Sequence, residues 1–335
     1  MFFKNLLKIK LFSLITIVVI VICLANILGG YLFLTGGLDE EKIVIIKPRL
    51  SIHKISVLLE KENVIKNAKL FEVISSVYAY FEPLKSGEYK FTKNITPYQV
   101  IKVLIRGKSI VHRMLIPEGY TAAQIVDMVN SESRLTGRIN GNIPEGYLMP
   151  STYFYSYGDQ RENLIDEMRK NMSKALDELM PKLPQTSPLK TRKDILILAS
   201  IVEKEAGNDQ ERAKIAGVFI NRLRKGMKLQ ADPTTVYAIT KGKTSLARSL
   251  NRQDMSIKSP YNTYHVYGLP EGPISCPGRA SLEAVVLPEE TDALYFVVDG
   301  KGGHNFSKTL KEHNRYVSEF RNRVRQQKLA KNKAA

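Results

Sequence analysis

Two glutamates, Glu203 and Glu205, follow an apolar run within the stretch DILILASIVEKEAG at residues 194–207. On a helix of about 100° per residue, Glu205 lies roughly 50° from the centre of the apolar face and Glu203 roughly 105° from it. Glu205 therefore extends the apolar stripe as a carboxyl group. Partial burial there would raise its pKa from about 4.3 to about 6, which suits a general acid in glycosidic bond cleavage. The alternative is that Glu205 is exposed, or is paired with Arg212 or Lys214.

The rest of the sequence gives little support to other chemistries. The segment KGKTS at residues 241–245 lacks the earlier glycine of a phosphate-binding loop, and no G-x-S-x-G motif of a serine hydrolase is present. Cys23 and Cys276 are the two cysteines, and their positions predict neither a catalytic thiol nor a disulfide. The histidines show no metal-ligand spacing: His53, His112, His265, His304 and His313. The sequence therefore predicts no metal and no cofactor.

The N-terminal segment Leu11–Leu34 predicts a membrane-spanning helix. It carries no formally charged residue, and about 20 apolar residues suffice to cross a bilayer. Lysines precede the segment and carboxylates follow it, so the positive-inside rule places residues 1–10 in the cytoplasm and the remainder of the chain outside. A cleaved signal peptide is the alternative. The segment LANILGGYLFL, however, stays apolar where a cleavage site would be expected, which favours an uncleaved anchor.

The chain of 335 residues has a formal net charge of +17, which indicates anionic surroundings such as nucleic acid, acidic lipid or an acidic polymer. A domain outside the cell does not meet nucleic acid, and no nucleic-acid-binding motif is present, so we expect no nucleic-acid partner. The basic side chains then form a solvated surface near anionic lipid or wall polymer. Residues 326–335 predict a frayed basic tail.

Three segments between residues 44 and 130 share one pattern, in which a short apolar strand and a turn precede an amphipathic helix. Ser51, Thr96 and Thr121 stand where helix N-caps belong, and Pro97 occupies the first helical position of the second helix. The pattern predicts a small module of strand–helix units over residues 42–130. Such a module more often binds or positions than catalyses, and a plain spacer is the alternative.

Residues 131–325 predict a larger domain of mixed composition. Helical periodicity dominates residues 160–225, which include both glutamates, and an apolar strand, ALYFVVDG, follows at residues 293–300. The fold class is therefore α+β: one N-terminal transmembrane helix, a small α/β module, and a mixed domain whose helical segment carries Glu205.

Four long segments in series carry a family resemblance: LASIVEKEA, ERAKIAGVFINRLRKGMKLQADPTTVYAI, YNTYHVYGLPEGPISCPGRASLEAV and LYFVVDGKGGHNFSKTLKEHN. In order and spacing they resemble the endolytic murein transglycosylase family, MltG or YceG-like. The segment IPEGYLMPSTYFY resembles a further family turn, with Ser151 where the family usually has Asp. A single N-terminal span and a LysM-like module also match, so the resemblance covers nearly the whole chain.

The resemblance implies a specific reaction. The family cleaves the β-1,4 bond between N-acetylmuramic acid and N-acetylglucosamine within peptidoglycan strands and leaves a 1,6-anhydro-muramic acid end. Its catalytic glutamate is the second of the E-K-E segment, which is Glu205 here, the residue that the helical phase also favours. The implied localisation is the bacterial cytoplasmic membrane, with lipid contacted through residues 11–34. The implied partners are glycan strands and, alongside them, peptidoglycan synthases.

Five polar residues of the matched segments are candidates for substrate binding. Gln230, Asn262 and Tyr264 match the L-Q-x-D and Y-N-T-Y positions and are expected to contact the sugars, or otherwise to stabilise turns. Asn221 follows an apolar helix stripe and either binds substrate or bridges elements internally. His304 either lines the cleft or closes the fold.

Two alternative functions remain open from the sequence. One is a true muramidase, a hydrolase that uses Glu205 together with Asp232 or Glu203. Glu203 is predicted to lie outside the apolar stripe, so its replacement is expected to cost little. The other alternative is a membrane-anchored wall-binding protein without enzymatic activity, in which the module over residues 42–130 makes the functional contact.

Overall fold

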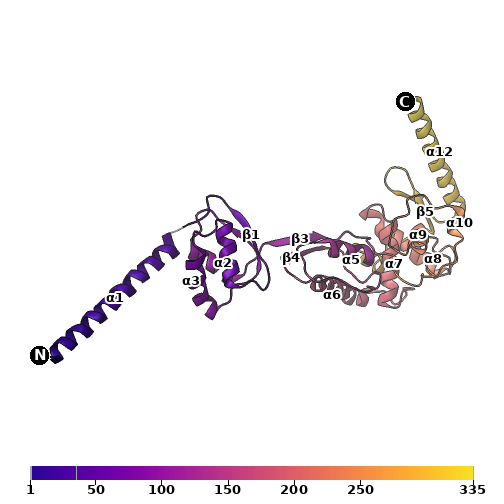
Figure 1. Cartoon of the computed structure of the whole chain (residues 1–335). Coiled ribbons are helices and arrows are strands. Elements are labelled where there is room, and N and C mark those ends of the chain that lie inside the picture. Colours follow the sequence, from indigo (N-terminus) through magenta and orange to yellow (C-terminus); the bar gives the residue numbers. More distant parts are fainter. Residues whose placement is uncertain (1, 35, 335) are drawn as a thin grey trace. The chain divides into compact units, whose positions relative to one another are not determined.

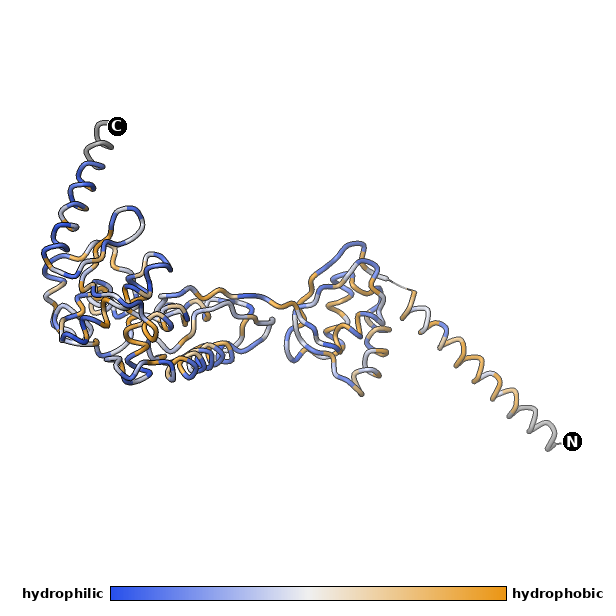
Figure 2. The backbone as a smooth tube through the Cα atoms, turned by 180° about the vertical axis from the view of Figure 1, so that it is seen from behind, coloured by the Kyte–Doolittle hydropathy of each residue, from blue (hydrophilic) through white to orange (hydrophobic). Residues whose placement is uncertain are grey.

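The structure is a computed structural model that describes residues 2–34 and 36–334. The chain forms two compact units (Figure 1). The first unit comprises the residues up to His112 with two short segments, Arg134–Thr136 and Phe154–Asp159, and the second comprises the remainder. Helix α1, Phe2–Leu34, opens the chain, and its segment Leu11–Leu34 is long and apolar enough to cross a membrane (Figure 2). Among the described residues, this is the one helix that meets both criteria.

The first unit has the element order β1, α2, α3, β2, α4. Strands β1 (Lys42–Ile46) and β2 (Gly87–Phe91) pair antiparallel, with Val44 opposite Tyr89. Alternate strand residues enter a core that the helices α2 (Ile52–Lys61), α3 (Ala68–Phe81) and α4 (Pro97–Arg106) complete.

The predicted helix starts are confirmed. The side chains of Ser51, Thr96 and Thr121 accept hydrogen bonds from backbone N–H groups three residues later, and the last two form reciprocal capping boxes. Pro97 occupies the first turn of α4, as expected.

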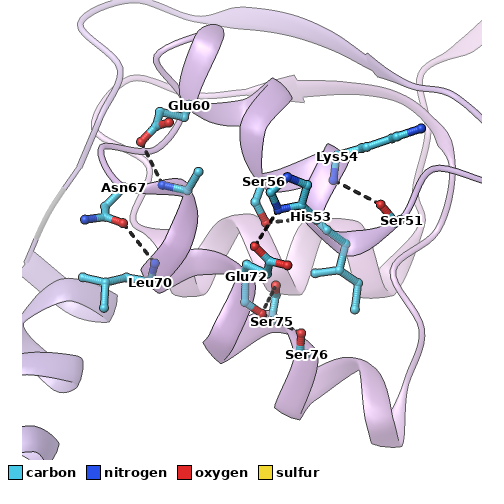
Figure 3. Close-up of polar contacts among 12 residues, drawn as sticks. Ser51, His53, Lys54, Ser56, Glu60, Asn67, Leu70, Glu72, Ser75 and Ser76 are labelled. Atoms are coloured by element: carbon cyan, nitrogen blue, oxygen red, sulfur yellow. Dashed lines mark hydrogen bonds and ion pairs between the residues drawn. The ribbon is translucent and has the colours of Figure 1, made fainter.

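Helix α3 is an element that the sequence pattern did not predict. Asn67 caps it by accepting from the N–H of Leu70, and Glu60 of α2 accepts from the N–H of Ala68. His53 of α2 contacts Glu72 of α3 at 2.8 Å, so polar side chains join the two helices (Figure 3).

The structure groups the third strand–helix segment differently from the predicted module over residues 42–130. Strand β3 (Val111–Leu115) pairs with β4 (Thr152–Ser156), and the chain passes between the two units within these strands. Helix α5 (Ala122–Ser131) belongs to the second unit.

Helix α7, Arg192–Glu205, lies at the centre of the second unit. Thr191 and Asp194 form a capping box at its start, and every residue from Ile195 to Val202 is buried. Neighbouring helices enclose it, and their apolar residues share its core: α6 (Arg161–Leu179), α8 (Arg212–Arg224) and α11 (Arg279–Val286). Short 3-10 turns follow α6 (Met180–Lys182) and precede α8 (Asp209–Glu211).

The remaining elements complete the second unit. They are α9 (Asp232–Thr240), α10 (Arg252–Met255), the antiparallel strands β5 (Tyr295–Val298) and β6 (His304–Ser307), and α12 (Leu310–Ala334). Helix α12 continues through the predicted tail, whose last residue lies outside the described residues. The mixed α+β class is confirmed, and each sheet among the described residues has two strands.

Candidate active site

Glu205 is the last residue of α7, and its half-buried side chain lines two adjoining cavities of the second unit. One cavity has a volume of about 380 Å³ and lies toward β5, β6 and the start of α12. The other has a volume of about 540 Å³ and lies toward α9 and the segment that follows it. Asp232, the first residue of α9, is the second residue common to both walls. The two carboxyl groups therefore stand where the cavities meet.

The environment of Glu205 favours the neutral acid. Burial raises its pKa from 4.5 to about 7, and the negative charge of Asp232 adds to the increase. The guanidinium of Arg222 and the backbone N–H of Asp232 act in the opposite direction. Because burial is the larger effect, a substantial fraction of the Glu205 side chains holds a proton at neutral pH.

Arg222 is fixed by the backbone around it. Its Nε donates to the Leu294 carbonyl at 2.6 Å, and an Nη donates to the Leu229 carbonyl at 2.7 Å. Its guanidinium also lies 5.1 Å from the ring centroid of Tyr295. Nε and one Nη thus donate to carbonyl groups, while the charge of the guanidinium acts on Glu205 and Arg222 lines the first cavity.

Asp232 is held beside Glu205 by Tyr264. The Tyr264 hydroxyl donates to Oδ1 of Asp232 at 2.6 Å, and burial together with this carboxylate raises the Tyr264 pKa. Asp232 also lies in the first turn of α9, where a negative charge is favourable. Tyr264, which the sequence predicts as a substrate contact, lines the first cavity, and its hydroxyl also holds the Asp232 carboxylate in place.

Gln230 and His304, two further predicted substrate contacts, also line the first cavity. Gln230 is exposed and has a backbone φ of 49°, in the left-handed region that few residues other than glycine adopt. His304 lies on β6, where its ring Nδ1 is 2.7 Å from Oε2 of Glu211. The backbone N–H of His304 donates to Oε1 of the same carboxylate. His304 therefore lines the cleft and also ties β6 to the turn before α8.

Asn262 and Asn221 are not among the described residues that line the two cavities. Asn262 is fully buried, its amide donates to the carbonyls of Met255 and Ile257, and its Oδ1 accepts from Thr235. The amide of Asn221 donates to two carbonyls of the segment before β5. Both side chains have the structural role that the sequence left as the alternative.

Three polar residues that line the first cavity were not predicted: Arg222, Tyr295 and His313. His313 stacks on Tyr295 at 5.3 Å, and its buried Nδ1 has no hydrogen-bond partner. Burial and the charge of Arg222 lower the His313 pKa, so the ring is neutral at pH 7. An unpaired buried lone pair costs less than an unpaired N–H, which favours the tautomer with its proton on Nε2. His313 therefore contributes a neutral imidazole to the wall of the first cavity.

The surroundings of Glu203 differ from those expected for a residue outside the apolar stripe. From Ile195 to Val202 helix α7 is buried on all sides rather than on one, and the Glu203 side chain is only 6% exposed. Its Oε2 accepts from the N–H of Gly278 at the start of α11, at 2.8 Å, and its Oε1 lies 3.5 Å from the Arg212 guanidinium. Glu203 therefore joins α7 to α8 and α11, away from both cavities, and its replacement is not expected to be harmless.

Replacing Asp232 with Asn is expected to shift the pH dependence of activity. The change removes a negative charge that raises the Glu205 pKa but keeps an acceptor for Tyr264. The alkaline limb of kcat/KM should therefore move to lower pH by roughly one unit. Asp292→Asn, which changes an exposed carboxylate paired with Lys308, is the matched control and should leave the profile in place. An unchanged limb in Asp232→Asn would contradict this role.

The sequence is similar to known proteins of one family. The model of the YceG-like family matches residues 44–319. The endolytic murein transglycosylase of Bacillus subtilis is 32% identical over 302 residues, which cover 81% of this chain and 82% of that protein. The endolytic murein transglycosylase of Streptococcus pneumoniae is 30% identical over 322 residues, covering 81% of this chain and 57% of that protein. A crystal structure of a YceG-like protein from Listeria monocytogenes shares 35% identity, with a TM-score of 0.49, over 83% of this chain and 99% of that chain.

Fold and site define an α+β protein in which a partly buried glutamate, Glu205, lies where two cavities meet. The chain belongs to the YceG-like family.

Proposed function

We propose that the protein is an endolytic peptidoglycan lytic transglycosylase and that Glu205 is its catalytic acid. The supporting observation is the position of one carboxyl group, with a pKa of about 7, at the junction of two cavities. Cavities on both sides of Glu205 suit an enzyme that cuts within a strand, because sugars must then extend in both directions from the cleaved bond. The names of the relatives from B. subtilis and S. pneumoniae support the same activity.

In the first step, the protonated Glu205 donates to the glycosidic oxygen between N-acetylmuramic acid and N-acetylglucosamine. The bond between this oxygen and C1 of the muramic residue breaks, and positive charge develops at C1. The N-acetylglucosamine side departs with a free 4-hydroxyl group. Glu205 is left as a carboxylate, next to the guanidinium of Arg222, which stabilises that charge.

In the second step, the Glu205 carboxylate accepts the proton of the muramic C6 hydroxyl, whose oxygen attacks C1 of the same ring. The product is the 1,6-anhydro sugar, Glu205 is protonated again, and no water is consumed. An internal nucleophile needs no second carboxylate to activate it. Asp232 then serves as a positioning residue that helps to keep Glu205 protonated.

The first cavity offers polar groups suited to a sugar. Gln230, Tyr264, His304 and His313 carry amide, hydroxyl and imidazole groups, and Phe296 adds an aromatic face. No group of three or more metal-ligating side chains is found among the described residues. We assign recognition of the glycan to these residues.

The N-terminal parts serve to place the enzyme at its substrate. Segment Leu11–Leu34 is proposed as a single-pass anchor in the cytoplasmic membrane, with the N-terminus inside and the residues that follow the span outside. The order β1, α2, α3, β2 supports a LysM-like wall-binding role for the first unit. Work alongside peptidoglycan synthases on nascent strands follows from the family resemblance.

A muramidase is the second candidate, because Asp232 shares both cavity walls with Glu205 and could activate a water molecule. Digestion of glycan strands in water enriched in oxygen-18 separates the two reactions. A transglycosylase gives anhydro-muramic ends without the heavy isotope, as read by mass spectrometry. Reducing muramic ends that carry oxygen-18 would identify a hydrolase and contradict the proposal.

A further inference from the structure

The exit of the proposed membrane span is joined directly to the first unit. Tyr31, in the last turns of α1, is buried, and its hydroxyl donates to the carbonyl of Asn67 at 2.8 Å. Leu28 and Leu32 pack against the same core. An added Cβ at Gly36 would lie 2.8 Å from the carbonyl oxygen of Asn94, so the chain packs closely against the unit just after the span. Residues on both sides of the span's end therefore pack against the part of the first unit that β1, α2, α3, β2 and α4 form.

Helix α3 lies beside this exit. Asn67, which receives the Tyr31 hydrogen bond, is the N-cap of α3. An aromatic series continues the contact: Phe33 of α1 lies 5.1 Å from Tyr98 of α4, and Tyr98 lies 6.2 Å from Tyr78 of α3. Two independent sets of contacts therefore connect α3 to the end of the span.

An apolar stripe of α3 faces solvent in this unit. The stripe consists of Val73, Val77, Tyr80 and Phe81, which are 62%, 61%, 86% and 78% exposed. Their spacing of four, seven and eight residues puts them on one side of the helix. The opposite side packs into the core, and Glu72 makes the polar contact to α2 (Figure 3). Two large aromatic rings on an open surface indicate that something covers the stripe.

We infer that the stripe of α3 lies in the headgroup region of the bilayer that α1 crosses. The inference rests on the proposed anchor and names a second contact with the same membrane. Tyrosine and phenylalanine on a helix face, next to a span, suit the boundary between water and acyl chains. Lys66 and Lys69 are exposed at the N-terminal end of α3, where they can meet anionic headgroups. The contact holds the first unit on the membrane surface and leaves its other faces free.

The absence of tryptophan from the sequence permits a direct test. Phe81→Trp puts a single reporter in the stripe of the full-length chain, reconstituted in vesicles of phosphatidylcholine and phosphatidylglycerol. Ile20→Trp reports from within the span. Ile43→Trp is the matched surface control, because Ile43 is exposed on the face of β1 that points away from the core. Lipids brominated on their acyl chains quench only tryptophan that reaches the bilayer.

The expected result is strong quenching at positions 20 and 81, a blue-shifted emission at position 81, and neither effect at position 43. Quenching at position 20 without quenching at position 81 would overturn the inference and leave the anchor standing. A blue shift at position 81 without quenching would mean that protein covers the stripe, which also overturns it. No quenching at position 20 would refute the anchor and this inference together. Glycan cleavage by each variant, measured in parallel, reports on the enzymatic proposal separately.

Discussion

Glu205→Gln is expected to lose glycan cleavage almost completely and to become more stable at alkaline pH. An amide cannot donate the proton that the leaving oxygen requires, and general acid–base catalysis typically contributes about 10²- to 10⁴-fold to a rate. Release of anhydro-muropeptides, followed by mass spectrometry, measures the loss. A variant with the activity of the wild type would show that another carboxyl group performs the chemistry.

The stability gain follows from the raised pKa. Folding shifts the Glu205 pKa from 4.5 to about 7, so the folded state binds this proton more tightly than the unfolded state does. The stability that this tighter proton binding gives the folded state is fully present below pH 4.5 and is lost as the pH rises through 7. Above pH 7 the wild type therefore carries an ionised buried carboxyl group, at a cost of roughly 3 kcal/mol that glutamine avoids. Denaturation at pH 5 and pH 8 should show a gain for Glu205→Gln at pH 8 and little at pH 5.

Glu203→Gln is expected to give the opposite result from a position two residues earlier. The change leaves the buried guanidinium of Arg212 without its partner on α7 and weakens the acceptor for the Gly278 N–H. Loss of a buried, charged hydrogen-bond partner typically costs about 2 kcal/mol. Activity per folded molecule should be preserved, because Glu203 does not border either cavity.

Each of the two variants serves as the control for the other, because both replace a glutamate with glutamine at the end of the same helix. Equilibrium unfolding in urea and cleavage assays at a temperature where both variants are folded give the two measurements. If folded Glu203→Gln loses activity while its stability is unchanged, the catalytic acid is Glu203 and the assignment to Glu205 is wrong.

Residue types close together in the sequence were sufficient to predict where several helices of the fold begin. Ser51, Thr96 and Thr121 were assigned as N-caps from residue type and the periodicity behind them, and each side chain makes the expected bond. Helix α3 was not predicted because its exposed face is also apolar. A helix is recognised from the contrast between an apolar and a polar face, and α3 lacks that contrast.

The site was predicted less completely than the helix that carries it. Helical phase selected Glu205, but most of α7 is buried on every side, so phase alone does not separate Glu205 from Glu203. Their neighbours separate them. Arg222 and His313 reach the cavity from distant parts of the chain, and no spacing in the sequence connects them to residue 205. Asn262 is the opposite case: it lies in a segment that resembles the family, but its buried side chain holds a turn together and does not line either cavity.

The central claim is that the Glu205 side chain holds its proton near neutral pH. Carbon-13 NMR of the side-chain carboxyl groups in glutamate-labelled protein measures this directly, with the signal assigned by its disappearance in Glu205→Gln. We expect a titration midpoint near pH 7, as burial beside Asp232 requires. A midpoint near 4.5, the ordinary value for glutamate, would contradict the account.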